Sequence, residues 1–369
     1  MKIYLMPQDL VKQISICQRA ISSRTTMPIL ECIHFEAGSN GLTLTATDLE
    51  LSIETFMPCR VEEEGNIVVP ANIIGNIFRK LPAEKTCIEE KNNTLSIDCG
   101  KIHYSLQLAS ADDFPALPVN DDSDITTLSN DDLMSAIKET EFATSIDESK
   151  IALTGIFLER KETSVKFVSL DGYRLAVREL NLDPQEKAFE AQAIVPKRAF
   201  IELSRIIPDE GRTKIKIMKG HIYFECGGFC MYSRLIDKKY IQYEEIISKD
   251  FKSRLVLNRK DFQESLERAS LLAREERANL IKLFIEKDSI NIKSNSEIGF
   301  VNEEIACSLE GEELRIAFNA KYLLDGVRAL ECETIRLDMK GPQNPLIIYP
   351  GQDEEKYLYL VLPVRIAGE

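Results

Sequence analysis

The chain has 369 residues, 44% of them hydrophobic, and a formal net charge of -14. That length predicts two or three domains, each able to bury a core. No apolar run approaches the roughly 20 residues of a membrane span, and residues 1–10 lack the basic and apolar regions of a signal peptide, so we expect a cytoplasmic protein without a membrane partner. The nine cysteines are odd in number and mostly isolated, which indicates reduced thiols.

The acidic balance disfavours nucleic acid at first sight, because a negative body repels phosphate at long range. However, the acidic residues cluster in segments that are typical of solvated loops, such as 61–65 and 120–124. Net charge therefore leaves open a basic surface elsewhere on the molecule.

The first predicted helix covers 8–22, where Leu10, Ile14 and Cys17 begin an apolar stripe at helical spacing. Alternating and β-branched residues predict strands at 28–37 and 41–54, and a second helix is expected at 69–82. More strands are expected within 87–110, before a linker at 112–124 that is rich in proline and acid.

The same order of elements returns twice. Helices like the first are predicted at 131–145 and 260–274, and Leu10, Leu133 and Phe262 align, so the period is roughly 125 residues. Helices like the second are predicted at 195–208 and 318–331. The predicted strands of these repeats lie at 151–160, 164–179, 214–237, 280–295, 297–310, 334–352 and 355–366.

The pattern therefore predicts an α+β protein of three similar domains, each with two helices packed on antiparallel sheet. The breaks in the pattern, at 112–124 and near 244–254, place these domains at 1–120, 125–247 and 252–369.

The second helix of each repeat carries basic residues at matching positions. Its fourth, eighth and eleventh positions share one face. In chain order these positions hold Asn72, Asn76 and Arg79, then Arg198, Glu202 and Arg205, then Lys321, Asp325 and Arg328, with Lys80 and Lys197 beside them. Each face has a formal charge of +1, and the expected core side carries Ile74, Ile77, Leu81 and their counterparts.

Two interpretations of these aligned arginines stay open from the pattern alone. A surface helix often carries cations in its last turn, where they interact favourably with the helix dipole. Alternatively, the helices line a wall that contacts DNA phosphates, which would give binding without sequence specificity and allow sliding.

Seven collinear motifs carry a resemblance to a known family. They are SSRTTMPIL at 22–30, TATDLELSIE at 45–54, VVPANIIGNIFRKLP at 68–82, SADDFPALP at 110–118, SLDGYRLAV at 169–177, AIVPKRAFIELSRIIP at 193–208 and YLVLPVRI at 359–366. Together, over essentially the whole chain, they resemble the β sliding clamp of bacterial replicative DNA polymerase.

The resemblance implies the DNA clamp fold, in which two chains form a head-to-tail homodimeric ring lined by helices around duplex DNA. It implies a processivity factor without catalytic residues, metal or cofactor, whose partners are the replicative DNA polymerase catalytic subunit, the clamp loader and other clamp-binding replication and repair proteins. The implied DNA-binding residues are Arg24, Arg79, Lys80, Lys197, Arg198, Arg205, Lys321 and Arg328.

The resemblance also implies a pocket for short partner peptides between the second and third domains. By position it comprises Leu153, Gly155, Leu170, Gly172, Tyr173, Arg174, Leu175, Ile246, Leu360, Val361, Leu362, Pro363, Val364 and Arg365. Apolar anchors with a few polar groups suit such a pocket. A closing core strand would explain Leu360 and Leu362 equally well.

This chain departs from the family pattern at the expected pocket rim. Ile241 stands where a proline is common, and Glu244 and Glu245 occupy a stretch that is often basic, so peptide preference is not predicted. The tail Ala367, Gly368 and Glu369 extends past the last motif. For the dimer interface, the resemblance indicates Tyr104 and Leu106 of one chain against Leu271 and Leu272 of the other.

Two other functions are weighed. An acidic, monomeric three-domain scaffold would bind peptides and no DNA. A carboxylate-metal hydrolase would use Asp48, Glu50, Asp112 or Asp113, but these residues lack metal-ligand spacing. A zinc site at Cys226, Cys230 and His221 is disfavoured for the same reason.

Overall fold

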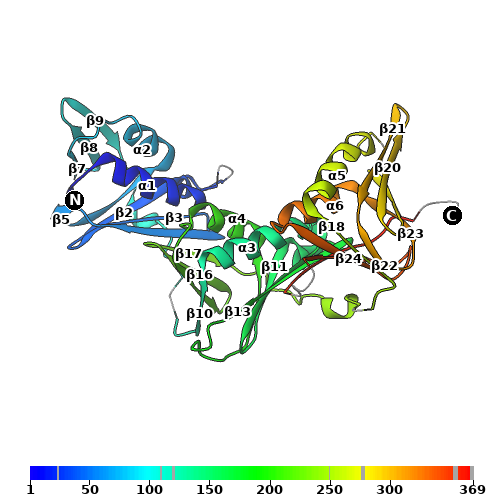
Figure 1. Ribbon diagram of the computed structural model, residues 1–369. Coiled ribbons are helices and arrows are strands. Elements are labelled where there is room, and N and C mark those ends of the chain that lie inside the picture. The colour runs from blue at the N-terminus through cyan, green and yellow to red at the C-terminus, as the bar shows by residue number, and fades with distance from the viewer. Residues whose placement is uncertain are drawn as a thin grey trace. The chain divides into compact units, whose positions relative to one another are not determined.

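The computed structural model describes residues 1–22, 25–108, 110–118, 121–248, 250–275, 279–351 and 356–365. The chain forms two compact units (Figure 1). The first comprises Met1–Leu133 with Arg198–Leu235, and the second comprises Met134–Lys197 with Ile236–Glu369. The middle repeat is thus divided between the units.

Antiparallel sheets form the framework of the first unit. One sheet has the order β5-β1-β7-β8-β9, with β1 at Lys2–Leu5, β5 at Arg60–Glu63, β7 at Thr86–Lys91, β8 at Thr94–Cys99 and β9 at Ile102–Gln107. The other has the order β10-β15-β16-β17-β4-β3-β2-β6, with β2 at Cys32–Gly38, β3 at Gly41–Thr47, β4 at Leu51–Met57, β6 at Gly65–Pro70, β10 at Ile125–Ser129, β15 at Arg212–Met218, β16 at His221–Cys226 and β17 at Phe229–Arg234.

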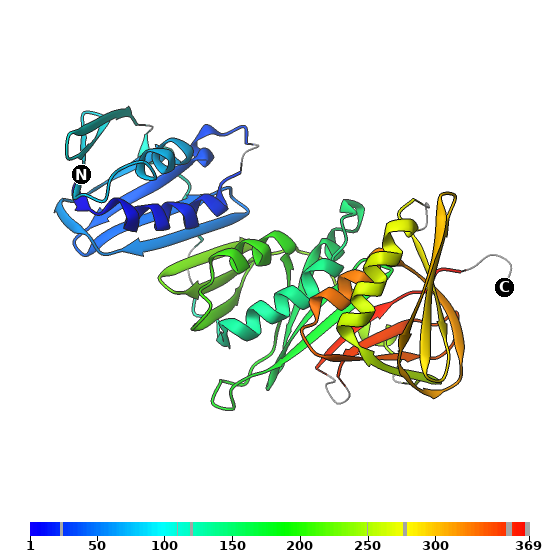
Figure 2. The same cartoon turned by 45° about the horizontal axis from the view of Figure 1, so that its top comes forward.

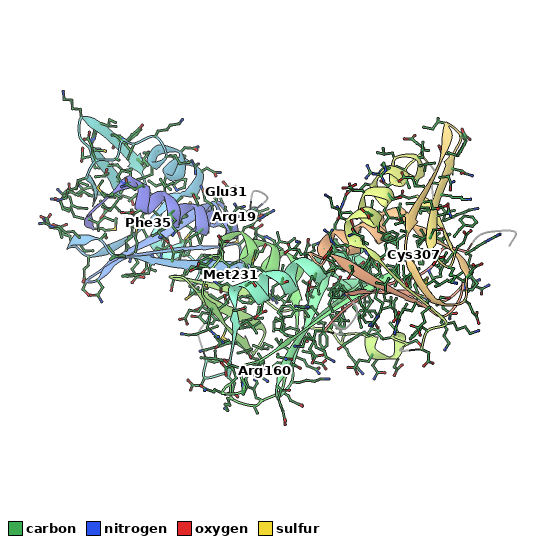
Figure 3. All side chains as sticks on the ribbon, in the orientation of Figure 1. Arg19, Glu31, Phe35, Arg160, Met231 and Cys307 are labelled. Atoms are coloured by element: carbon green, nitrogen blue, oxygen red, sulfur yellow. The ribbon has the colours of Figure 1, made fainter. Side chains whose placement is uncertain are left out.

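Pairing of β17 with β4 joins strands of the first and second repeats into one sheet, with Met231 opposite Ile53. Both of these side chains are fully buried, as is Phe35 on β2, and Figure 3 labels Phe35 and Met231. The repeats are therefore continuous in their hydrogen bonding as well as in sequence.

The second unit is also built on antiparallel sheets. One has the order β14-β11-β12-β13-β26-β25-β24-β18-β22, with β11 at Gly155–Arg160, β12 at Ser164–Leu170, β13 at Arg174–Asn181, β14 at Ala191–Pro196, β18 at Ser253–Asn258, β22 at Ser308–Gly311, β24 at Thr334–Met339, β25 at Leu346–Pro350 and β26 at Tyr357–Val361. The other has the order β21-β20-β19-β23, with β19 at Leu280–Ile285, β20 at Ser289–Ser296, β21 at Gly299–Ala306 and β23 at Leu314–Asn319.

The helices form as the apolar spacing predicts. The α-helices are α1 at Pro7–Cys17, α2 at Ala71–Phe78, α3 at Asn130–Thr140, α4 at Lys197–Ile206, α5 at Arg259–Ala273 and α6 at Ala320–Ala329. Short 3-10 helices lie at Gln18–Ala20, Pro28–Glu31, Ala111–Asp113, Glu141–Ala143, Glu148–Thr154 and Tyr243–Ile246. The division between the two units falls within α3 and α4.

In the first unit α1 packs on β4 and beside α2, and in the second unit α5 packs on β20 and beside α6 (Figures 1 and 2). Pro7 starts α1, where a missing backbone N–H costs nothing. Asn258 caps α5, because its side-chain oxygen accepts hydrogen bonds from the backbone of Lys260 and Asp261 at 2.9 and 3.1 Å.

Several details differ from the sequence prediction: the strands predicted at 28–37 and 151–160 begin as 3-10 helices, and most of the helices are shorter than predicted. A strand precedes the opening helix of each repeat, namely β1, β10 and β18, whereas the pattern predicted that each repeat starts with the helix. In addition, α2 ends at Phe78, so that Phe78 is buried while Ile77 and Leu81 are only half-buried. In the other two copies the expected core residues Phe200, Leu203, Ile207, Leu323, Val327 and Leu330 are all buried.

The core of the second unit also contains a buried charge. The guanidinium of Arg160, a residue labelled in Figure 3, lies 4.3 Å from the ring centroid of Phe189 and donates to the carbonyls of Phe189 and Lys187 at 3.2 and 2.8 Å. These contacts satisfy donors that would otherwise be costly to bury.

Candidate functional site

The polar face of the repeated second helix is exposed in all three copies. Arg79, Arg205 and Arg328 are exposed, and each lies at the C-terminal end of its helix, Arg79 as the capping residue after α2. Arg24, another residue of the expected DNA-binding set, lies outside the described residues.

The three arginines donate hydrogen bonds to different groups. Arg79 donates from Nη2 to the amide oxygen of Asn76 at 2.7 Å. Arg205 instead donates to the Glu202 carboxylate at 2.6 Å, and Arg328 donates from Nε and Nη2 to the Glu267 carboxylate at 3.0 and 2.9 Å. Two of the three positive charges are therefore partly neutralised within the chain.

The remaining candidate cations also differ in whether a carboxylate pairs with them. Lys197 pairs with Glu141 at 2.8 Å, Lys321 pairs with Asp325 at 2.6 Å, and Arg198 pairs with Asp48. Lys80 is exposed beside Arg79. The end of α2 thus carries the least neutralised of the three basic faces.

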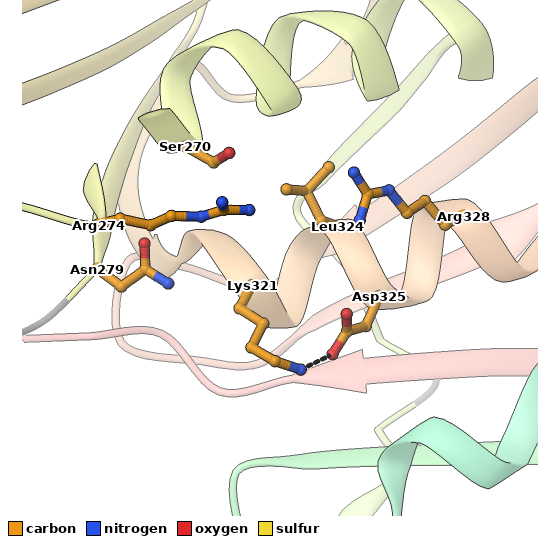
Figure 4. A pocket seen from close by; sticks show the side chains of 7 residues that line it. All are labelled: Ser270, Arg274, Asn279, Lys321, Leu324, Asp325 and Arg328. Carbon is orange, nitrogen blue, oxygen red and sulfur yellow. Dashed lines mark hydrogen bonds and ion pairs between the residues drawn. The ribbon is translucent and has the colours of Figure 1, made fainter. Parts of the chain in front are cut away.

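A depression of about 360 Å³ lies between α5 and α6 in the third repeat (Figure 4). Its lining residues are Ser270, Arg274, Asn279, Lys321, Leu324, Asp325 and Arg328. Two of these lining residues, Lys321 and Arg328, belong to the expected DNA-binding set, whereas Arg274 was not indicated by the repeat pattern. Arg274 could have been found only by comparing the ends of the opening helices.

The expected peptide-pocket residues lie together in the second unit, around the β12–β13 turn and β26. Leu153, Leu170, Leu175 and Leu360 are buried in one apolar cluster, and Leu175 is opposite Leu360 across the sheet. The cluster also contains Phe157 and Tyr240, whose rings stack at 4.8 Å between centroids. These side chains form the floor of the region.

Exposed apolar side chains border that floor. Tyr173 is 59% exposed and stacks on Tyr322 with 6.0 Å between ring centroids. Leu362 and Ile246 are also exposed. Ile246 and Leu360 line a shallow depression of about 30 Å³, together with Ile347.

The chain after β26 is held in place by its backbone. Leu362 N–H donates to the Tyr173 carbonyl and Val364 N–H donates to the Ala317 carbonyl, both at 2.8 Å. Val361 is buried, Pro363 and Val364 are half-buried, and Arg365 is exposed. The tail at 367–369 lies outside the described residues.

Glycines shape two points of this region. A Cβ on Gly155 would lie 2.7 Å from the Val195 carbonyl oxygen, so the close approach of β11 to β14 requires glycine. Gly172 has φ +97°, in the β12–β13 turn where Asp171 accepts hydrogen bonds from the backbone of Tyr173 and Arg174.

Arg174 is buried rather than presented to solvent. It donates to Asp171 at 2.9 Å, to Asp325 at 2.6 Å and to the Phe142 carbonyl at 2.8 Å, and its guanidinium lies 4.6 Å from the Tyr322 ring centroid. It therefore links the β12–β13 turn to α6.

The rim residues that depart from the family pattern are exposed. Ile241 is exposed beside the buried Tyr240 and Tyr243, and Glu244 lies 3.5 Å from Lys166 and 3.8 Å from Lys161. The acidic charge of Glu244 is therefore partly offset, while Glu245 is exposed nearby.

The expected dimer residues lie on an edge strand and on a helix. Tyr104 and Leu106 are half-buried on β9, which is an edge strand, and Leu271 on α5 is 65% exposed with Leu272 half-buried beside it. The edge strand β21 also presents Phe300, which is 79% exposed. Sequence reasoning missed Phe300 because alternation alone does not show which strand ends a sheet.

Several of the residues weighed for a metal site make other contacts. Asp48 caps its own turn by accepting from the backbone of Glu50 and Leu51, and Glu50 pairs with Arg234 at 3.3 Å. Cys230 contacts the Tyr223 hydroxyl at 3.1 Å, and Cys226 lies 3.4 Å from the Asn130 amide. Within the described ranges, no three His, Cys, Asp or Glu side chains are grouped to hold a metal ion, and no described helix is long and apolar enough to cross a membrane.

Comparison with known proteins identifies the family. Family models of the DNA polymerase III beta subunit match residues 1–118 (N-terminal domain), 127–242 (central domain) and 244–365 (C-terminal domain). A beta sliding clamp of Bacillus subtilis is 35% identical over 99% of this chain and 100% of its own length, and one of Staphylococcus epidermidis is 33% identical over 96% and 97%.

Solved structures agree with this family. A DNA polymerase sliding clamp from Bacillus subtilis has a TM-score of 0.96 at 34% identity, covering 99% of both chains. The beta subunit from DNA polymerase of Streptococcus pyogenes has a TM-score of 0.95 at 28% identity, covering 99% of this chain and all of its own. The chain therefore belongs to the DNA polymerase III beta subunit family, whose members are non-enzymatic DNA sliding clamps of replication.

Proposed function

We propose that two copies of this chain, joined head to tail, form a ring in the cytoplasm that encircles duplex DNA and tethers the replicative polymerase. The partners would be the DNA, the second copy, the polymerase catalytic subunit, the clamp loader and other clamp-binding proteins. Three domains, at 1–120, 125–247 and 252–369, would each contribute two helices to the lining of the ring.

The observation that carries this proposal is the position of Arg79, Arg205 and Arg328. They occur at matching places in three repeats, they are exposed, and the chain that carries them has a net charge of -14. Contacts between arginines and phosphates hold duplex DNA without reading its sequence, and they break and reform as the protein slides.

The contact between the two copies in the ring would use β9, β21 and the end of α5. Edge strands with exposed apolar side chains tend to pair with another chain. We propose that β9, with Tyr104 and Leu106, meets β21 and the Leu271–Leu272 end of α5 in the second copy. Phe300 would be covered in this contact.

The apolar region around Leu170, Leu175, Leu360 and Leu362 would bind partner peptides. Buried leucines supply a preformed floor, and exposed Tyr173, Ile246 and Leu362 would be covered by the peptide. Arg174 would hold the shape of the floor and would not contact the peptide charge directly, because its donors are used inside the chain.

Two measurements test the proposed function. Light scattering should give twice the mass of the chain, and Leu271→Glu should shift that mass toward the monomer. Duplex oligonucleotides of unrelated sequence should bind equally well, with an affinity that falls steeply as salt rises. A monomeric chain that binds client peptides but no DNA would instead support the acidic scaffold.

A further inference from the structure

The space between the two helices of a repeat is occupied differently in the first and third repeats. Since Leu10, Leu133 and Phe262 align, the residues eight positions later, Gln18, Glu141 and Ser270, are also equivalent. Each lies near the start of the second helix of its repeat, where the equivalent residues are Ala71, Lys197 and Ala320.

In the first repeat a long side chain crosses this space. Gln18 Nε2 donates to the Ala71 carbonyl at 2.9 Å, and it lies so close to α2 that a Cβ on Gly75 would come within 2.8 Å of it. At the equivalent position of the second repeat, Glu141 pairs with Lys197 at 2.8 Å.

The third repeat is open at the same place. Ser270 is too short to cross, and its hydroxyl donates back to the Glu267 carbonyl at 2.7 Å. Ala320 on the facing helix is also small. The result is the depression of about 360 Å³, a size within the roughly 300–1,000 Å³ of small-ligand sites.

Cationic side chains converge on this depression. Figure 4 shows the guanidinium groups of Arg274 and Arg328 pointing toward one another on either side of Leu324, whereas the Lys321 side chain extends away from them toward Asp325. Arg328 and Lys321 are already paired with Glu267 and Asp325. Among the described residues no ion pair involves Arg274, which is exposed, so its charge is available to an anion.

We propose that this depression binds a backbone phosphate of duplex DNA, with Arg274 as the principal contact and Arg328 as the second. Planar guanidinium groups suit phosphate oxygens because they donate two parallel hydrogen bonds. The inference rests on the proposed DNA-encircling function and adds to it a binding residue, Arg274, that has Ser22 and Ser145 as its counterparts in the other repeats.

The test is fluorescence anisotropy of a labelled duplex oligonucleotide with the full chain at several salt concentrations. Arg274→Ala should weaken binding and reduce the slope of log K against log salt by about 1, the value for one lost phosphate contact. Ser270→Gln should also weaken binding, because it fills the depression as Gln18 does in the first repeat without changing the charge. The matched control is Lys287→Ala, which removes one exposed charge beyond the other end of β19 and should leave the slope unchanged.

Thermal unfolding of each variant shows whether the fold is kept, and Arg274→Lys, which keeps the charge, should recover most of the slope. Equal slopes for Arg274→Ala and Lys287→Ala would overturn the phosphate site while leaving the DNA function intact. Binding of inorganic phosphate at Arg274, measured by NMR without any change in the DNA slope, would also overturn it. A wild-type chain that does not bind duplex DNA would refute both the site and the proposed function.

Discussion

Arg174 and Asp325 form an ion pair across 151 positions of sequence, with 2.6 Å between Nη1 and Oδ2. The same carboxylate oxygen accepts a hydrogen bond from Lys321 Nζ at 2.6 Å. Arg174 is buried, whereas the Lys321 side chain is 63% exposed. Asp325 therefore makes one contact with a buried side chain and the other with an exposed side chain of α6.

Asp325→Ala should destabilise the protein by about 3 kcal/mol, because it leaves a buried guanidinium without one of its carboxylates. Lys321→Ala removes the other partner of Asp325 and should cost less than about 1 kcal/mol, because that pair is exposed to water. Urea unfolding of the two variants measures both values. Equal losses of stability would show that burial does not distinguish the two contacts.

Part of this arrangement is readable from the sequence. The 3.6-residue spacing of Leu323 and Val327 predicts the buried side of α6, and the aligned repeats predict Asp325 and Arg328 on the polar side. The partners of those polar residues are not readable. Arg174 and Glu267 come from distant segments, and their positions depend on how β13 and α5 pack against α6.

Arg79→Ala should weaken binding of duplex DNA more than Arg205→Ala. To contact a phosphate, Arg79 breaks only a hydrogen bond to a neutral amide, whereas Arg205 breaks an ion pair with the Glu202 carboxylate. Salt-dependent binding of a duplex oligonucleotide to both variants measures the difference. A larger loss for Arg205→Ala would mean that the local ion pair does not limit contact with phosphate.

Leu362→Asp should reduce the affinity for client peptides by about thirtyfold, or about 2 kcal/mol, without lowering the Tm, because Leu362 is exposed at the edge of an apolar floor. Ile146→Asp is the matched control, since Ile146 is 98% exposed in the same unit and should leave peptide affinity unchanged. Isothermal titration calorimetry with a client peptide compares the two. Unchanged affinity in Leu362→Asp would remove this residue from the peptide site.

Cys17 should make stability fall at alkaline pH. Burial raises the pKa of its thiol to about 12, so the folded state holds a proton that the unfolded chain releases near pH 9. The stabilising contribution is complete below about pH 9 and is lost toward pH 12, at about 1.4 kcal/mol per pH unit. Urea unfolding of wild type and Cys17→Ala between pH 8 and pH 11 measures it, and parallel pH profiles would contradict this assignment.

Some residues of the candidate site could not be identified from the sequence. Gln18 and Ser270 occupy equivalent positions, but only their contacts reveal that Gln18 crosses the space between two helices while Ser270 borders a depression. Similarly, Arg174 was expected among pocket residues, yet its donors are used inside the chain. The type and position of a residue predict which face of a helix or strand it occupies. What the residue does there also depends on the length of the side chain opposite it.

The most direct test of the ring is retention on DNA of defined topology. The labelled protein, loaded by its clamp loader onto a nicked circular plasmid, should stay bound at moderate salt and should be released within minutes after one double-strand cut, because an encircling protein slides off free ends. Retention that is the same on the circle and on the linear product would contradict the account.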